Sequence, residues 1–93
     1  MRLSAGERQI IRQTIAAADA DAAVYLFGSR ADDNAKGGDI DLLVLSQSIN
    51  LMTKLDILAK LHQALGEQKI DLAVYADLSH PFARLAHKNG VSL

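Results

Sequence analysis

The sequence predicts one α/β domain: a small mixed sheet of three to four strands with two or three helices packed mainly on one face. Short β-prone apolar runs alternate along the chain with longer stretches whose apolar residues recur every three or four positions. The length of 93 residues corresponds to a single domain, and the 49% hydrophobic content supplies one core. Residues 1–93 are therefore interpreted as one domain of the α/β (α+β) class.

Composition excludes several classes of function. The net charge of −1 and the two tyrosines and two phenylalanines argue against direct nucleic-acid binding, which uses a basic surface and stacked aromatic side chains. The absence of cysteine excludes disulfides and thiolate metal sites. Neither a signal peptide nor an apolar run of membrane length is found, so we expect a cytoplasmic protein that does not contact membranes.

The first third of the chain predicts a helix and then a strand. Leu3–Asp19 has an apolar stripe at helical spacing, and Ser4 with Glu7 three residues later forms a capping box that starts the helix. Ala22–Phe27 is a nearly continuous apolar run, which is typical of a strand covered on both faces. A second strand is expected from Asp39 to Leu45 after a polar loop.

The remainder predicts two more helices and one or two strands. Leu51–Leu65 carries a leucine seam at 3–4 spacing, most of which serves the core while some of its surplus could cover a partner. Lys69–Tyr75 predicts a third strand. A last helix should begin at Ser79-His80-Pro81 and end at Asn89-Gly90, and Val91–Leu93 forms a short strand or frays.

The stretch between the first two strands carries the candidate chemistry. Asp39 and Asp41 point to the same face of their strand, with Cα atoms about 6.5 Å apart, because side chains alternate along a strand. Two neighbouring carboxylates repel each other, and a hard divalent cation between them removes the repulsion. Gly28-Ser29 ends the preceding strand, where a glycine allows close approach and free N–H groups of a helical turn favour a phosphate.

This pattern resembles a known signature. Gly28-Ser29, nine residues and then Asp39-Ile40-Asp41 before an apolar run is similar to the motif of the DNA polymerase β-type nucleotidyltransferase superfamily. The short chain resembles its minimal nucleotidyltransferase branch, whose members are often encoded beside a helical HEPN-domain partner and are described as antitoxins. The resemblance implies an ATP or other nucleoside triphosphate substrate and two Mg²⁺ ions.

Two further residues are assigned with the help of this resemblance. Asp71 is the one charge within the apolar run Ile70–Tyr75, and the family takes a third carboxylate from such a strand; the alternative is an exposed acid paired with Lys69. Arg30 follows the Gly-Ser turn, where a guanidinium suits a triphosphate; the alternative is a surface ion pair with Asp32 or Asp33. The predicted metal ligands and catalytic residues are thus Asp39, Asp41 and Asp71, and the predicted nucleotide-binding residues are Gly28, Ser29 and Arg30.

The implied reaction transfers AMP from ATP to a hydroxyl group, with a tyrosine of the HEPN-type partner as acceptor and the chain acting as antitoxin. The alternative is an inert or weak subunit that neutralises its partner by contact. Asp32-Asp33 favours this alternative, because relatives commonly have Arg-Gly there and two acids beside a triphosphate are unfavourable unless they are paired; Lys36 could offset them. A partner or a second copy of the chain is expected to complete the pocket of so small a domain.

Overall fold

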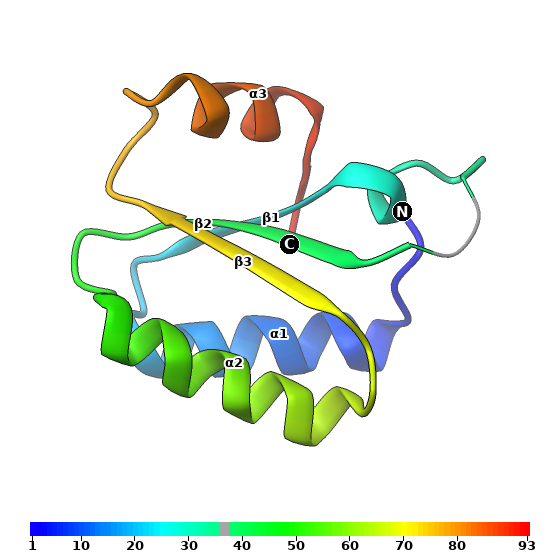
Figure 1. Cartoon of the computed structure of the whole chain (residues 1–93), viewed down its shortest axis with the longest axis horizontal. Helices are drawn as coiled ribbons and strands as arrows, with labels where there is room; N and C mark the ends of the chain where they lie inside the picture. Colours follow the sequence, from blue (N-terminus) through cyan, green and yellow to red (C-terminus); the bar gives the residue numbers. More distant parts are fainter. Residues whose placement is uncertain (36–37) are drawn as a thin grey trace.

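A single mixed sheet of four strands, flanked by three α-helices, forms the computed structural model within its described residues, 1–35 and 38–93 (Figure 1). The elements follow in the order α1 (Ala5–Ala18), β1 (Ala23–Phe27), the 3₁₀-helix η1 (Gly28–Ala31), β2 (Ile40–Leu45), α2 (Leu51–Leu65), β3 (Ile70–Tyr75), α3 (Pro81–Asn89) and β4 (Val91–Ser92). The predicted α/β class is confirmed, and Val91–Ser92 forms the short final strand. Lys36, which the sequence analysis named as a residue that could offset Asp32 and Asp33, and Gly37 lie outside the described residues.

The strand order places the second and third strands side by side. The sheet runs β3-β2-β1-β4, with β1 antiparallel to both β2 and β4, and with β2 parallel to β3. Parallel neighbours need a long crossover, and α2 provides it. As a result, β2 and β3 begin at the same end of the sheet, which is also where the antiparallel β1 ends.

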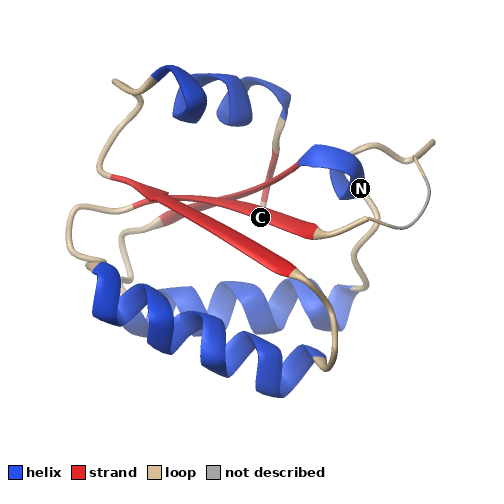
Figure 2. Cartoon of the chain, viewed as in Figure 1, coloured by secondary structure: helices blue, strands red, loops and turns tan. Residues whose placement is uncertain are grey.

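The helices cover both faces of the sheet unequally. Figures 1 and 2 show α1 and α2 on one face and the shorter α3 on the other. The larger core lies between the sheet and α1 and α2, and the smaller core lies beneath α3. Within β2, Leu42 and Val44 belong to the larger core whereas Leu43 belongs to the smaller one. Asp41 therefore shares the α3 face with Leu43, because alternate side chains point to opposite faces.

Local capping explains where the helices begin. The Ser4 hydroxyl accepts a hydrogen bond from the Glu7 N–H, and the Glu7 carboxylate accepts one from the Ser4 N–H, which confirms the predicted capping box of α1. Asn50 caps α2 through the N–H of Thr53. Among the described residues, no helix has the length and apolar character needed to cross a membrane.

Candidate active site

Two carboxylates meet at the end of the sheet where β2 and β3 begin. Asp41 and Asp71 are direct partners in the parallel register of these strands, and Phe27, the last residue of β1, is opposite Asp41 on the other side. Asp71 belongs to an edge strand and is exposed, whereas Asp41 in the next strand is partly buried. Strand pairing therefore brings together two of the three predicted carboxylates, although they are 30 positions apart in the sequence.

The electrostatics of this carboxylate pair favour a proton or a cation between the two groups. The pKa of Asp41 is raised, first by its burial and then by its hydrogen bond with Asp71 and by repulsion from the charge of Asp71. Asp39 adds repulsion, and Lys69 opposes the shift. A carboxylate that is this close to another carboxylate is stabilised by a positive partner. The pair thus has the chemistry of a hard-cation ligand set.

The third predicted carboxylate, Asp39, is near enough to Asp41 to repel it but forms an ion pair with Lys69. Its Oδ2 atom lies 3.5 Å from the ammonium of Lys69 in a largely exposed ion pair. Within residues 1–35 and 38–93, no three histidine, cysteine, aspartate or glutamate side chains form a group that could hold a metal ion. Two of the predicted carboxylates are therefore adjacent, and the role of all three as metal ligands stays a prediction. Sequence reasoning had assigned Lys69 to Asp71 as its alternative partner, but the ion pair forms with Asp39.

Gly28 connects the Asp41 carboxylate to the turn that follows β1. Its φ of 72° is in the left-handed region, and a Cβ atom at this position would collide with Oδ2 of Asp41. The residue therefore has to be glycine, both for its backbone conformation and for the close approach of the carboxylate. Gly28 also starts η1, whose first N–H groups lack helical partners. The predicted helical turn after the first strand is confirmed.

The Ser29 side chain packs closely against Gly38, just before β2 begins. Gly38 has a φ of 94°, and a Cβ atom there would collide with the hydroxyl of Ser29. The two predicted turn residues, Gly28 and Ser29, thus contact the chain on both sides of Asp39: Gly28 contacts Asp41, and Ser29 contacts Gly38. Their predicted contacts with a nucleotide stay predictions.

Within the described residues, Arg30 does not form the ion pair with Asp32 or Asp33 that the sequence offered as one alternative. Its guanidinium donates hydrogen bonds to the carbonyl oxygens of Gly38 (3.2 Å) and Arg2 (3.0 Å) and to Oε1 of Gln68 (3.0 Å). Gln68 in turn donates to Oε2 of Glu7 (3.1 Å). Neither Arg2 nor Gln68 stood out in the sequence, because no motif or periodic pattern distinguishes them from surface residues. A direct contact between Arg30 and phosphate stays a prediction.

The two acids that depart from the family pattern have partners of their own. Asp33 forms an ion pair with the amino group of Met1, and the carboxylate of Asp32 accepts a hydrogen bond from the N–H of Asn34 at 2.9 Å. Both residues are exposed. Their charges are therefore partly compensated locally or directed to solvent, which reduces the repulsion that a phosphate in this loop would meet.

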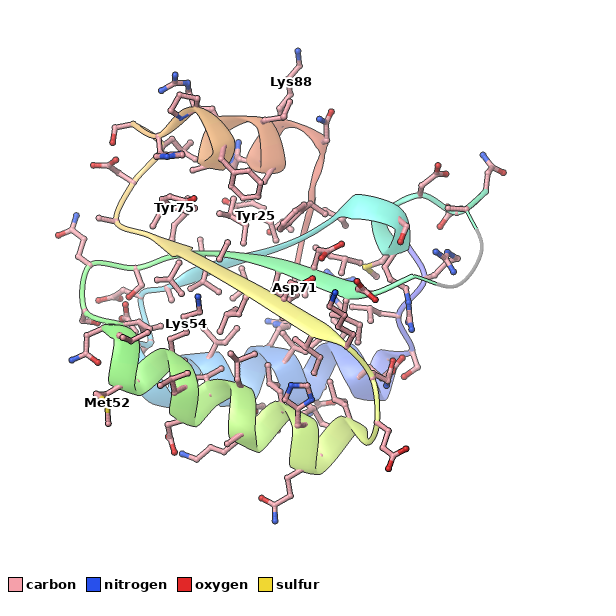
Figure 3. The ribbon with its side chains drawn as sticks, in the orientation of Figure 1. Tyr25, Met52, Lys54, Asp71, Tyr75 and Lys88 are labelled. Atoms are coloured by element: carbon pink, nitrogen blue, oxygen red, sulfur yellow. The ribbon has the colours of Figure 1, made fainter. Side chains whose placement is uncertain are left out.

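Two hollows share the side chains of Phe27 and Phe82, and the carboxylate pair lines one of them. One, of about 490 Å³, extends along β3 and α2, where Figure 3 shows Lys54 projecting from α2 and Asp71 near the start of β3; it is lined by Phe27, Asp41, Lys54, Leu58, Ile70, Asp71, Leu72, Ala73 and Phe82. The other, of about 450 Å³, lies beside the turn and is lined by Phe27, Gly28, Ala31, Asp32, Phe82, Leu85 and Asn89. Phe27 and Phe82 line both hollows and contact each other edge-to-face with ring centroids 5.7 Å apart. The site thus has an opening on either side of one aromatic pair.

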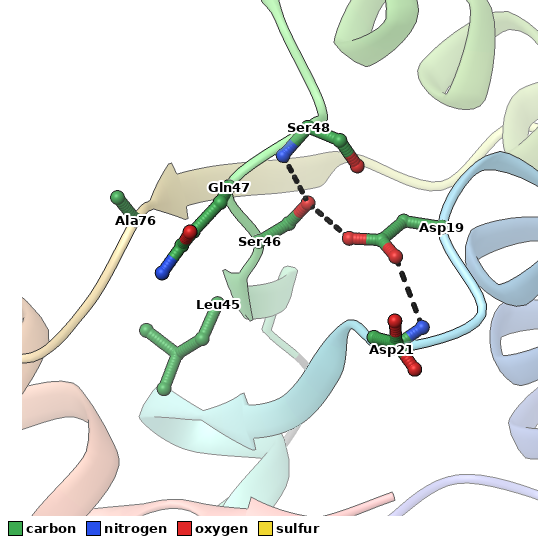
Figure 4. A pocket seen from close by; sticks show the side chains of 7 residues that line it. All are labelled: Asp19, Asp21, Leu45, Ser46, Gln47, Ser48 and Ala76. Carbon is green, nitrogen blue, oxygen red and sulfur yellow. Dashed lines mark hydrogen bonds between the residues drawn. The ribbon is translucent and has the colours of Figure 1, made fainter.

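A further polar hollow, of about 390 Å³, lies at the opposite end of β2 (Figure 4). Its buried Ser46 donates a hydrogen bond to Oδ2 of Asp19 at 2.5 Å and accepts from the N–H groups of Ser48 and Ile49. The hydrogen bond from Ser46 is also the first cause of the lowered pKa of Asp19. These polar groups satisfy one another and connect the end of α1 to the loop before α2, which is a structural role.

Comparison with known proteins identifies the family that has this arrangement. A family model described as "Polymerase beta, Nucleotidyltransferase" matches residues 9–93. No curated protein sequence matches the chain. Among solved structures, a crystal structure of the toxin–antitoxin MntA-HpeT, in a mutant with two aspartate-to-glutamate changes, is similar with a TM-score of 0.72 and 22% identity. The match covers 92% of this chain and 70% of that one, and at this identity it shows a shared fold.

Proposed function

This chain belongs to the polymerase beta nucleotidyltransferase family, and on that premise we propose that it transfers a nucleoside monophosphate, AMP from ATP, to a hydroxyl group. The observation that supports this most directly is the pairing of Asp41 with Asp71 beside the left-handed Gly28. That pair has the donor chemistry for Mg²⁺, which accepts carboxylate and phosphate oxygens together. Bound Mg²⁺ would neutralise charge on the triphosphate and lower the pKa of the attacking hydroxyl.

The residues of the chain have distinct roles in this proposal. Asp41 and Asp71 would hold the cation, and Asp39 would be the third ligand once released from its exposed ion pair with Lys69. Gly28 and Ser29 place the first N–H groups of η1 against the β- and γ-phosphates. Asp71, which is exposed at the edge of the sheet, is available to accept the proton of the acceptor hydroxyl. The hydroxyl oxygen then bonds to the α-phosphorus, and the bond from that phosphorus to the pyrophosphate oxygen breaks.

The acceptor that we propose is a tyrosine of a HEPN-type helical partner, so that the chain acts as an antitoxin. The similar fold in a toxin–antitoxin pair supports this assignment. The hollow along β3 supports it as well, because it combines both carboxylates with the apolar walls of Phe27 and Phe82 and is open enough to admit a side chain from another protein. A tyrosine ring suits such walls, since aromatic pairs gain energy beyond their burial.

A second candidate is an antitoxin that acts by contact alone. The observation that favours it is an exposed apolar strip on α2, where Leu51, Met52 and Leu55 remain 67%, 74% and 51% exposed. This alternative requires only a binding surface and does not depend on an intact carboxylate pair. The family assignment is the same under both candidates.

The test incubates the chain with ATP labelled on its α-phosphate, Mg²⁺ and a HEPN-type helical protein as the proposed partner. We expect label on the partner protein, and we expect Asp71→Asn to reduce labelling by about a hundredfold or more, because it removes a metal ligand. Asp77→Asn, at an exposed acid outside the site, serves as the matched control. If Asp71→Asn no longer labels the partner but still neutralises it, the contact mechanism is favoured. Unchanged labelling of the partner by Asp71→Asn would contradict the proposed site.

A further inference from the structure

We infer that Arg30 and Gln68 are positioning residues that set the spacing of the carboxylate pair and hold the phosphate turn against it. This inference rests on the proposed function and deepens it. Three segments meet at the site: the turn after β1, the entry to β2 and the entry to β3. Arg30 is on the first segment and donates to Gly38 on the second and to Gln68 on the third. One guanidinium therefore connects every segment that carries a predicted site residue.

The second half of the connection comes from Gln68. This residue is three positions before Asp71, and its amide group donates both to Oε2 of Glu7 in α1 and to the carbonyl oxygen of Leu65 at the end of α2 (2.9 Å). The start of β3 is thereby fixed to both helices and to the turn at once. Asp71 is exposed on an edge strand, where pairing with β2 on one side places it opposite Asp41, so the segment just before it contributes to holding it there.

The groups that hold the Arg30 side chain differ from the acidic partners that the sequence suggested for it. All three of its recorded acceptors are neutral: two backbone carbonyl groups and one amide oxygen. Within the described residues, its guanidinium forms no ion pair with a carboxylate. The side chain is therefore held in position by neutral groups, and the Glu7 carboxylate, which accepts a hydrogen bond from Gln68, interacts electrostatically with its charge.

A positioning role and a direct phosphate contact predict different results for metal binding without nucleotide. Groups that orient metal ligands typically contribute about ten- to a hundredfold to metal affinity. Gln68 has no positive charge to offer a phosphate, so its removal should weaken metal binding only if it positions the carboxylates. Arg30 could act in either way, which makes Gln68 the more informative residue.

The experiment is calorimetric titration of the whole chain with MnCl₂, first alone and then with a non-hydrolysable ATP analogue. For Gln68→Met, which keeps the side-chain length, we expect Mn²⁺ affinity to fall about tenfold or more while circular dichroism remains that of the folded chain. Arg30→Met should lower Mn²⁺ affinity as well, and Arg30→Lys should recover part of the nucleotide affinity but little of the Mn²⁺ affinity, because lysine cannot bridge three segments.

Two matched variants serve as controls. Arg84→Met removes an arginine that also donates to two backbone carbonyls, those of Leu78 and Ser79, but does so away from the site. Gln63→Met removes an exposed glutamine from α2. Wild-type Mn²⁺ affinity in folded Gln68→Met would overturn the positioning role while leaving the proposed function intact. A wild-type chain that binds neither Mn²⁺ nor the analogue would overturn both.

Discussion

At the scale of single residues, the Asp41 carboxylate lowers the free energy of unfolding and is also a proposed metal ligand. Burial and the neighbouring Asp71 raise its pKa, so the folded chain holds a proton at this carboxyl more readily than the unfolded chain does. The free energy of unfolding therefore decreases as the pH rises through the folded-state pKa of Asp41, and the cost is relieved below it. A bound cation would relieve the repulsion between Asp41 and Asp71, so a destabilising carboxylate pair of this kind is expected at a metal-binding site.

This cost gives a prediction about stability. Asp41→Asn should raise the free energy of unfolding at pH 7 by up to about 1 kcal/mol, because it removes a like charge directly opposite Asp71. The gain should shrink as the pH is lowered and Asp41 of the wild type takes up its proton. Urea denaturation of both chains across the acidic range measures it, with Asp21→Asn, at an exposed carboxylate, as the control. A variant that is less stable than the wild type at pH 7 would contradict the assignment of repulsion.

Residue by residue, the sequence predicted the residues of the motif better than the hydrogen bonds and ion pairs around them. Gly28, Asp41 and Asp71 could be found because a strand-breaking glycine and acids within apolar strands are unusual in local context. The ion pair of Asp39 with Lys69 and the hydrogen bonds of Arg30 could not be predicted. They depend on which loops become neighbours in three dimensions, and side chains of these types are common on any surface.

At the scale of elements, periodicity and capping were sufficient to predict the helices and strands. Leu51–Leu65 has the predicted bounds, and the capping box of Ser4 and Glu7 is formed. The position of α3 on the opposite face from α1 and α2 was not predicted individually, because a short amphipathic helix can pack on either face of a sheet. Its packing matters for the site, since Phe82 at its start faces Phe27.

The end of β2 away from the site gives a prediction at this scale. Ser46→Ala should lower the free energy of unfolding by about 1–3 kcal/mol, because the buried N–H group of Ile49 and the part-buried N–H group of Ser48 lose their acceptor. Nucleotide binding at the opposite end of the strand should be unchanged in the folded variant. Thermal and urea denaturation measure the first effect, with Gln47→Ala as a control from the same hollow. Equal stability of the two variants would show that the Ser46 contacts contribute little.

At the scale of the whole molecule, the domain is thin and its candidate site is open. The described chain spans 34 × 30 × 18 Å, and the hollow that contains both carboxylates lies along an edge strand. A site at the edge of so thin a domain has little protein of its own to enclose two substrates. We therefore expect a partner protein or a second copy of the chain to complete the pocket, as the sequence had indicated.

The central claim is that the carboxylate pair and the glycine turn form a nucleotide site that depends on Mg²⁺. Its most direct test is calorimetric titration of the whole chain with a non-hydrolysable ATP analogue, with and without Mg²⁺, in the wild type, Asp41→Asn and the control Asp77→Asn. We predict binding that requires Mg²⁺, is retained by Asp77→Asn, and is lost in Asp41→Asn although that variant remains folded. Binding of equal affinity in Asp41→Asn, or binding that is indifferent to Mg²⁺, would contradict the account.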